Sequence, residues 1–314
     1  MITWSSLSQV PTDFAGTAVT IGKFDGIHLG HQQLLAELLD TAEDAALAPV
    51  VLSFNSHPNT QLNPSAAPLP IIGAHQKQFL LAEAGVEALL SLEFDDEFAS
   101  LSPEQFVQHY LVEGLRAEWV LVGEDFRFGN GGAGNIDLLR ELGDKHGFRV
   151  KVVAPVTVDG QIVSTTRIRA LLDAGDVAAA ASLLGRPHTT IGVIEHGLKI
   201  GRQIGFPTAN MSREAEGYLP LDAVYAGWLY VGEERYPAAL SVGINDTFQA
   251  VPRLVEAHVI DETSLDLYDK IVTLEYVAFI RRAAKFDGLE SLVVAINNDI
   301  SKIRDILGIT APSA

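Results

Sequence analysis

Residues 1–184 alternate short apolar runs with amphipathic helical patterns, and this alternation restricts the fold more than any other feature of the chain. Such a pattern is typical of a parallel sheet whose strands are joined by helices that cover its faces. The apolar runs predict strands at 18–24, 49–54, 87–94, 118–123 and 149–156. Apolar residues at helical spacing predict helices at 31–46, 103–114, 135–147, 164–175 and 176–185. We therefore expect an N-terminal α/β domain over 1–184.

The pattern changes at residue 185. The stretch "GRPHTT" has the composition of a linker, and short β-like runs separated by glycine, proline and aspartate follow it. These runs lie at 191–197, 224–232, 236–244, 254–261 and 270–280. Their spacing favours a small antiparallel β-barrel, and a helical pattern at 289–307 closes the chain. The sequence thus predicts a second domain of a different fold over 185–314.

Composition excludes several classes of function. The formal net charge of −18 argues against a nucleic-acid partner, because lysine and arginine neutralise the phosphates in such complexes. The chain has no cysteine, which excludes disulfides, thiolate metal sites and cysteine nucleophiles. It shows no signal-peptide pattern and no apolar run long enough to cross a bilayer, so we expect a soluble cytoplasmic protein without a membrane partner. The oligomeric state stays open, homo-oligomers included.

The stretch "GKFDGIHLGH" (22–31) lies between the first predicted strand and the first predicted helix. Ligands of open α/β sheets bind at the carboxyl ends of strands, and a helix N-terminus there offers unpaired amides to an anion. Glycines let the backbone approach phosphates, and the two imidazoles can bind phosphate oxygens and, when protonated, stabilise developing charge. The candidates are Gly22, Phe24, Asp25, His28, Gly30 and His31.

Two alternatives compete for this stretch. Glycine and histidine can simply form a turn and cap a helix, and two histidines can be metal ligands, although no third ligand of suitable spacing stands nearby. The H-x-G-H spacing matches neither the dinucleotide fingerprint nor a Walker loop. It favours the phosphate site of a nucleotidylyltransferase.

Three other stretches lie at ends of the same predicted strands or open a helix: "FNSHP" (54–58), "GEDFRFGNGGAGN" (123–135) and "STTRIR" (164–169). Hydroxyls and arginines at a helix start suit the β- and γ-phosphates of a nucleotide. Taken singly, each stretch could hold a core histidine, a surface turn or arginines paired with acids. Their joint position favours one nucleotide site. The candidates are His57, Asp125, Arg127, Ser164, Thr165 and Arg167.

In the second half, "GLKIGRQIGFPTAN" (197–210) combines glycines, cations and small polar residues. The glycines allow a loop to fold over phosphates, and Thr208 and Asn210 share one face if they lie on a strand. Their neutral oxygens suit a magnesium ion whose charge ATP already offsets. The alternative is a plain glycine-proline turn of a β domain. The other candidates are Gly197, Lys199, Gly201, Arg202, Gly205, Phe206 and Pro207.

Glu256 is a carboxylate on an otherwise apolar predicted strand. Phosphoryl transfer needs one group that orients and deprotonates the attacking hydroxyl, and a carboxylate suits that task. Strict alternation places Glu256 and His258 on one face of the strand and Ala257 on the other, so an outward-facing barrel residue is the alternative.

These stretches carry a family resemblance. "GKFDGIHLGHQQLL", "DFRFG" and "STTRIR…LLGRPH" resemble the N-terminal module of the prokaryotic bifunctional riboflavin kinase/FAD synthetase (FMN adenylyltransferase) family. "GVIEHGLKIGRQIGFPTANM", "VEAHVID" and "DLYD" resemble the kinase motifs of that family in the same order. The resemblance implies a Rossmann-like nucleotidylyltransferase domain that makes FAD and pyrophosphate from FMN and ATP. It also implies a kinase-type barrel that makes FMN and ADP from riboflavin and ATP, with Mg2+ serving both reactions.

The resemblance also implies residue roles. His28 and His31 would bind the ATP phosphates and stabilise adenylyl transfer, and Glu256 would accept the proton of the riboflavin 5′-hydroxyl. Thr208 and Asn210 would hold magnesium and ATP. The residues that would support the nucleotides or flavin are His57, Asp125, Arg127, Ser164, Thr165, Arg167 and, in the loop "GINDTF", Asn245.

The sequence departs from the family pattern at three positions. Asn55 replaces an aspartate, Asp246 a proline, and Asp269 a glycine that would permit positive φ. None of these positions has a chemical role in our assignment.

Three rival functions remain open at this point. One half alone could be active, the barrel could serve a flavin-binding regulator, or the first domain could adenylylate pantetheine phosphate or a nicotinamide nucleotide. Turnover of riboflavin separates them from the bifunctional enzyme.

Overall fold

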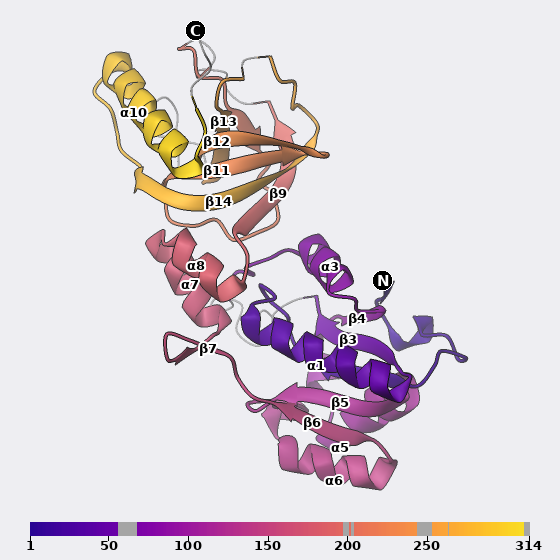
Figure 1. Ribbon diagram of the computed structural model, residues 1–314. Coiled ribbons are helices and arrows are strands. Elements are labelled where there is room, and N and C mark those ends of the chain that lie inside the picture. The colour runs from indigo at the N-terminus through magenta and orange to yellow at the C-terminus, as the bar shows by residue number, and fades with distance from the viewer. Residues whose placement is uncertain (56–67, 197–200, 202–203, 244–252, 263, 311–314) are drawn as a thin grey trace. The chain divides into compact units, whose positions relative to one another are not determined.

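The computed structural model describes residues 1–55, 68–196, 201, 204–243, 253–262 and 264–310 (Figure 1). The chain divides into two compact units, and we describe each by itself. Unit 1 comprises Met1–Pro70 and Ala74–Ser164, and unit 2 comprises Ile71–Gly73 and Thr165–Ala314. The stretch 165–185, where two helices are predicted, falls in unit 2, and the domain boundary between 184 and 185 stays a prediction. Within the described residues, no helix is long and apolar enough to span a membrane.

Unit 1 is built on a six-stranded sheet of order β1-β4-β3-β2-β5-β6. Every pair of neighbouring strands in it is parallel. The strands are β1 (Ile2–Trp4), β2 (Thr17–Ile21), β3 (Ala48–Phe54), β4 (Ala88–Leu92), β5 (Ala117–Gly123) and β6 (Arg149–Val153). The strand order reverses at β2, whose neighbours are β3 on one side and β5 on the other. Such a switch point is where open α/β sheets bind ligands.

Helices connect the strands of this sheet. They are α1 (Leu29–Ala45), α3 (Ala74–Glu83), α4 (Asp96–Ser100), α5 (Pro103–Phe106), the π-helical segment η3 (Val107–Gly114) and α6 (Ile136–His146). Helix α1 packs against β2, β3 and β5. A core cluster joins strand residues such as Val19 and Val120 to apolar residues of α5, η3 and α6. Short 3-10 turns (Leu7–Gln9 and Asn130–Gly132) and a hairpin of β7 (Thr157–Val158) and β8 (Gln161–Ile162) complete the unit.

The five strands predicted for unit 1 are confirmed, although the first ends earlier than its apolar pattern suggests. It was expected over 18–24, whereas β2 stops at Ile21. The chain turns there because Phe24 and Ile27 have φ values of 50° and 38°, which are incompatible with a strand. The helix expected over 103–114 exists as α5 followed by the π-helical η3. β1, α3, α4 and the β7–β8 hairpin were not predicted.

Unit 2 contains a closed barrel of order β10-β13-β12-β11-β14-β9, in which all strand pairs are antiparallel. Its strands are β9 (His188–Glu195), β10 (Ala209–Met211), β11 (Ala223–Val231), β12 (Glu234–Gly243), β13 (Leu254–Val259) and β14 (Ile271–Arg282). Helices α7 (Thr165–Ala174) and α8 (Val177–Leu184) pack on each other, and α8 also packs on β14 and β9. The predicted barrel and the helix that follows it are confirmed.

The closing helix α10 (Leu289–Leu307) covers one side of the barrel. Ile303 is fully buried against Ala226 of β11 and Ile260. Asp299 of α10 forms two hydrogen bonds with Nε of Arg281, at 3.0 and 2.9 Å, and a third contact at 2.8 Å with Nη2. The side chain of Asp299 is 6% exposed, so this paired charge fixes how the helix docks on β14.

His188, the first residue of β9, makes the stability of unit 2 sensitive to acid. It is 2% exposed, its Nε2 lies 2.6 Å from the carbonyl oxygen of Tyr218, and burial lowers its pKa to about 4. Because the folded pKa lies below the unfolded one, the unfolded chain takes up the proton first as the pH falls. We expect His188 to remove about 3 kcal/mol of stability between pH 7 and pH 4.

Urea unfolding at both pH values measures this loss, and the variant His188→Gln, which keeps an N–H donor but does not titrate, is the control. The variant should lose less stability on acidification than the parent chain. Equal losses would contradict the prediction.

Candidate functional site

The loop between β2 and α1 is held against the core by its own apolar side chains. Phe24 is fully buried and Ile27 is 3% exposed, both with positive φ. Backbone strain of this kind persists where the surroundings impose it, often at functional sites. The amide of Gly22 donates to the carbonyl oxygen of Leu52 at 3.1 Å, which ties the start of the loop to β3. The loop therefore has one defined path at the carboxyl edge of the sheet.

His28 caps the N-terminus of α1. Its Nδ1 accepts from the amide of His31 at 3.4 Å, and the two imidazole rings stack with centroids 3.8 Å apart. A Cβ atom at position 30 would lie 3.2 Å from the ring of His28, so Gly30 leaves the space that the ring needs. One alternative interpretation of the sequence, that this stretch caps a helix, is therefore correct for His28. It does not exclude a ligand, because the cap places the imidazole at the positive end of a 17-residue helix.

His31 has an unsatisfied polar atom. Among the described residues its Nδ1 is buried without a hydrogen-bond partner, and the ring lies 5.1 Å from that of Phe24. Burial, followed by the charges of His28 and Lys77, lowers the pKa of His31 well below its ordinary value. The ring is therefore neutral near pH 7. A phosphate bound beside it would raise that pKa and provide the missing partner.

Lys77 is a residue of this site that sequence reasoning missed. From α3 its Nζ donates to the carbonyl oxygen of Phe54 at 3.1 Å and to Oγ of Ser53 at 3.3 Å, at the carboxyl end of β3. Ser53 in turn donates to the carbonyl oxygen of Lys23 at 3.2 Å. Burial lowers the pKa of Lys77, and Asp25 partly offsets this effect. A cation thus lies next to the predicted phosphate loop.

The other predicted residues of the first site are distributed as follows. Asp125 and Arg127 are exposed in the loop after β5, which pairs with β2, so they lie at the same edge of the sheet as the histidines. Ser164 ends unit 1, whereas Thr165 and Arg167 belong to α7 of unit 2. His57 lies outside the described residues. The structure therefore brings the 22–31 loop together with Lys77.

Two of the predicted kinase residues, Asn210 and Glu256, meet on β10 and β13, whereas Thr208 lies just before β10. Asn210 lies directly opposite Glu256 in the antiparallel pair of these strands, and Glu256 lies opposite Ser241 of β12. Residues directly opposite each other have Cβ atoms about 4.5–5.5 Å apart, so their side chains share one small region. His258, two residues on, lies with its Nδ1 2.8 Å from the carbonyl oxygen of Pro207. This contact ties the segment before β10 to β13.

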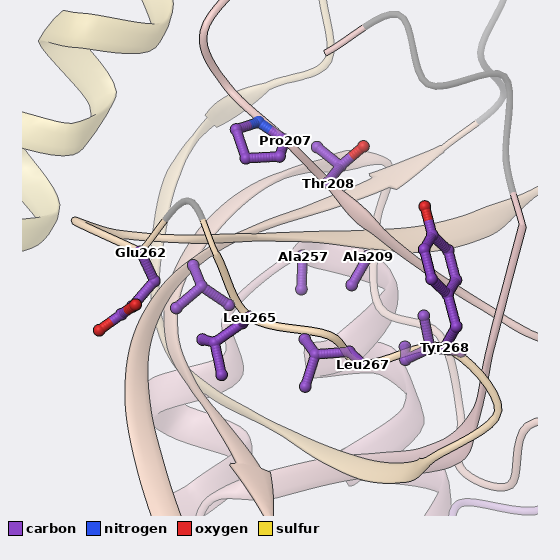
Figure 2. Close-up of a pocket in the computed structure, with 10 residues that line it drawn as sticks. Pro207, Thr208, Ala209, Ala257, Glu262, Leu265, Leu267 and Tyr268 are labelled. Atoms are coloured by element: carbon purple, nitrogen blue, oxygen red, sulfur yellow. The ribbon is translucent and has the colours of Figure 1, made fainter. Parts of the chain in front are cut away.

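A pocket opens on the other face of β13 (Figure 2). Its lining is mostly apolar, with Thr208, Glu262 and Tyr268 as the side chains that carry polar atoms. Ala257 lines it and Glu256 does not, as the alternation along the strand requires. The remaining lining residues are Ile194, Pro207, Ala209, Val259, Leu265 and Leu267. An apolar pocket with few polar groups suits part of a small organic ligand.

Part of the glycine-rich stretch before β10 forms a tight turn. The carbonyl oxygen of Gly201 accepts from the amides of Phe206 at 2.8 Å and Ile204 at 3.2 Å. A Cβ atom at position 201 would collide with the carbonyl oxygen of Phe206, and Gly205 has a φ of 88°. Both glycines are therefore needed for the turn itself. The candidates Gly197, Lys199, Arg202 and Asn245, and the departure Asp246, lie outside the described residues.

The other two departures have clear local structures. Asp269 has a φ of 61°, so the position where a glycine is common does require a positive φ. Beside it, the ring of Tyr268 lies 3.9 Å from that of His196. Asn55 accepts a hydrogen bond from Ser91 through its Oδ1. Neither departure disturbs the residues assigned to chemistry.

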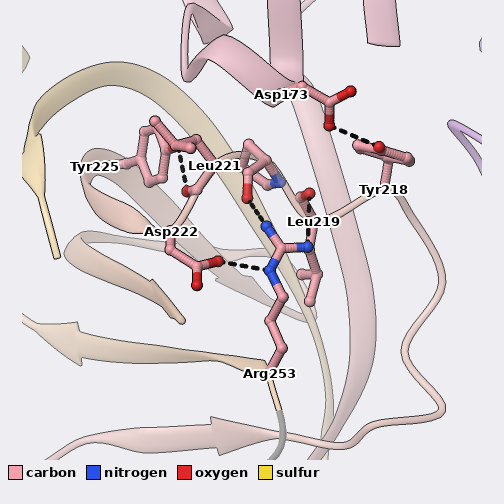
Figure 3. A network of polar contacts seen from close by, with 8 residues as sticks. Asp173, Tyr218, Leu219, Leu221, Asp222, Tyr225 and Arg253 are labelled. Carbon is pink, nitrogen blue, oxygen red and sulfur yellow. Dashed lines mark hydrogen bonds and ion pairs between the residues drawn. The ribbon is translucent and has the colours of Figure 1, made fainter. Parts of the chain in front are cut away.

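A network around Arg253 anchors the start of β13, and the sequence did not predict it (Figure 3). Nε of Arg253 lies 2.6 Å from Oδ1 of Asp222, Nη1 donates to the carbonyl oxygen of Leu219 at 3.2 Å, and Nη2 donates to that of Pro220. Tyr218, next in this loop, donates to Asp173 of α7 at 2.7 Å. Arg253 thus joins the strand of Glu256 to the loop 219–222.

We expect Arg253→Ala to lower the stability of the chain by about 2 kcal/mol, because one carboxylate and two carbonyl groups lose a shared donor. Thermal unfolding of the full chain measures the effect. Arg213→Ala removes an exposed arginine of the same unit and is the matched control. Equal transition temperatures for the two variants would show that the network contributes nothing.

Comparisons with known proteins agree with these features. Family models for FAD synthetase and riboflavin kinase match residues 10–167 and 184–307, respectively. A bifunctional riboflavin kinase/FMN adenylyltransferase of Pseudomonas fluorescens is 35% identical over 309 residues, which cover 98% of this chain and 97% of that protein. The protein of the same description from Escherichia coli strain K12 is 34% identical with the same coverage.

A solved structure is also similar to the whole chain. A crystal structure described as a macrolide-efflux protein from Streptococcus pneumoniae has a TM-score of 0.87 and 32% sequence identity. The match covers 97% of this chain and 98% of that one, so both units have counterparts in a single solved chain.

Proposed function

This chain belongs to the family of bifunctional riboflavin kinase/FMN adenylyltransferases, and from that premise we propose which of its residues serve each reaction. The chain phosphorylates riboflavin to FMN with ATP and adenylylates FMN to FAD with release of pyrophosphate. The observation that carries the assignment of residues is that each motif set lies on the fold its reaction needs. The H-x-G-H loop follows a central parallel strand, and Asn210 faces Glu256 in the barrel.

Adenylyl transfer is assigned to the 22–31 loop of unit 1. An oxygen of the FMN phosphate attacks the α-phosphorus of ATP, the bond from that phosphorus to the bridging oxygen breaks, and pyrophosphate leaves. His28 holds its imidazole over the N-terminus of α1, and His31 offers the unsatisfied Nδ1 to a phosphate oxygen. Both groups act on charge that grows during the displacement. His57, Asp125, Arg127, Ser164, Thr165 and Arg167 remain proposed nucleotide-binding residues.

Phosphoryl transfer is assigned to β10 and β13 of unit 2. The 5′-hydroxyl oxygen of riboflavin attacks the γ-phosphorus of ATP, its proton passes to the carboxylate of Glu256, and ADP leaves. Burial lowers the pKa of His258, and its Nδ1 lies 2.8 Å from the carbonyl oxygen of Pro207, so this neighbour on the same face adds no positive charge beside Glu256 near pH 7. Glu256 is half-buried, which keeps the carboxylate reachable by a substrate hydroxyl.

The kinase residues fit a magnesium ion that arrives with ATP. The described residues contain no group of three His, Cys, Asp or Glu able to hold a metal alone. Magnesium commonly needs only one or two protein groups besides phosphates and waters. We assign this role to the amide oxygen of Asn210, opposite Glu256, and to the hydroxyl of Thr208, which precedes β10 and lines the pocket. When bound, the ion neutralises charge on the β- and γ-phosphates. We also propose that the protein works in the cytoplasm on small molecules, without a nucleic-acid or membrane partner.

A chromatographic time course with riboflavin, ATP and magnesium tests the assignment of two activities. Riboflavin should convert to FMN and then to FAD. FMN that accumulates without FAD would show that the 22–31 loop serves another purpose. Flavin binding without any conversion would support a regulator that uses the barrel as a sensor.

A further inference from the structure

We propose that the ammonium group of Lys77 is a further anion-binding group of the adenylyl-transfer site and contacts the pyrophosphate portion of ATP. The inference rests on the assignment of adenylyl transfer to the 22–31 loop. Lys77 belongs to none of the sequence motifs described above, and only the fold of α3 places it beside that loop.

Hydrogen bonds fix the position of this ammonium group. Its two acceptors, the carbonyl oxygen of Phe54 and Oγ of Ser53, lie at the carboxyl end of β3. That end neighbours the end of β2, because Ile21 pairs with Leu52. Ser53 links the ammonium to the loop through the carbonyl oxygen of Lys23. An ammonium has three N–H donors, and these bonds use two of them.

The electrostatic surroundings of Lys77 favour a bound anion. Both of its acceptors are neutral, and in the described part of the chain no carboxylate lies within ion-pair distance of its Nζ. Burial has the larger effect on the pKa of Lys77, and the charge of Asp25 offsets only part of it. A half-buried cation without a close counter-charge is costly, and an anion that binds beside it recovers that cost.

Other groups of positive character converge on the same place. The charge of Lys77 lowers the pKa of His31, so the two side chains are close enough to repel each other when both are protonated. His28 has the same effect on His31, and the N-terminus of α1 adds its partial positive charge. Such a convergence of groups of like charge is unfavourable by itself, and an anion that occupies the space between them offsets their repulsion.

The reaction explains why the pyrophosphate portion of ATP is the expected contact. When the α-phosphorus accepts the FMN oxygen, the electron pair of the broken bond stays on the leaving pyrophosphate, and no proton has to move. A fixed ammonium stabilises that growing charge more than it stabilises bound ATP. Lys77 should therefore affect both the rate of FAD formation and the binding of free pyrophosphate.

The test uses the full chain and compares Lys77→Gln with Lys77→Arg. FAD formation from supplied FMN is measured as kcat and KM for ATP, together with inhibition by added pyrophosphate. FMN formation from riboflavin is measured in the same preparations. Lys145→Gln, the same change at an exposed lysine of α6, is the matched control, and Ser53→Ala removes one hydrogen-bond acceptor of Lys77 but keeps its charge.

We expect Lys77→Gln to lower kcat/KM for FAD formation by about 10²-fold and to weaken pyrophosphate inhibition, with partial recovery in Lys77→Arg. FMN formation should not change. Activity of Lys77→Gln equal to that of Lys145→Gln would overturn the proposal. So would a loss that Ser53→Ala reproduces in full or that extends to FMN formation, because either result indicates a structural role. If the parent chain made no FAD, the assignment of adenylyl transfer would fail first, and the two failures are thus distinct.

Discussion

Glu256→Ala is expected to lower the rate of FMN formation by about 10³-fold, because the riboflavin hydroxyl loses the carboxylate that takes its proton. FAD formation from supplied FMN should stay at the level of the parent chain, since Glu256 lies on β13 in unit 2 and the 22–31 loop lies in unit 1. Initial rates of the two reactions, each started from its own flavin, measure both effects in one preparation.

Two further variants make this result specific. Glu256→Gln keeps the size of the side chain and its hydrogen bonding but cannot accept a proton, so it should be almost as inactive as the alanine variant. Glu290→Ala removes an exposed carboxylate of α10 in the same unit and should leave both reactions unchanged. The role of Glu256 as base would be wrong if the glutamine variant retained most of its FMN formation, or if both reactions fell equally.

His28→Ala is expected to slow FAD formation by about 10²-fold with little effect on FMN formation, because the ring that lies over the N-terminus of α1 and stacks on His31 is lost. The same change removes a helix cap, which costs about 1 kcal/mol of stability. Activity and thermal unfolding must therefore be measured together.

His28→Asn separates these two effects. Asparagine is a good helix cap but has no imidazole, so this variant should keep the stability of the parent chain and lose FAD formation as the alanine variant does. Full activity of His28→Asn would show that the cap alone matters and would remove the imidazole from the chemistry. Equal instability of both variants would show that the stacked rings, rather than the cap, stabilise the loop.

The spacing of apolar residues predicted most of both folds, because the side chains that a strand or helix buries recur with the period of that element. The run expected at 49–54 became β3 over Ala48–Phe54, and the helix expected at 135–147 became α6 over Ile136–His146. Helix α3 escaped prediction since only Gln76 and Leu81 of its ten residues are buried, which leaves no apolar pattern to detect. Lys77 was missed together with its helix.

The sequence motifs predicted which residues belong to the candidate sites, but they did not predict how these residues lie relative to one another. Alternation along β13 predicted the face that Glu256 shares with His258, but the register that sets Asn210 opposite Glu256 depends on how the barrel closes. Arg253 carries no motif at all. Its acceptors include the carbonyl groups of Leu219 and Pro220, more than thirty residues earlier in the chain. Because every residue has a backbone carbonyl group, the amino-acid sequence does not indicate which of them accept a hydrogen bond.

The stretch "STTRIR" lies across the division of the chain, with Ser164 in unit 1 and Thr165 in unit 2. A chain divided between Ser164 and Thr165 would lose the continuity of this motif, because Ser164 would stay with unit 1 and the two arginines with unit 2. A break after α8 would spare the motif but would strip α8 from β14 and β9, against which it packs. Neither place allows a clean separation, so each half expressed alone is expected to lack motif residues or packing contacts that it has in the full chain.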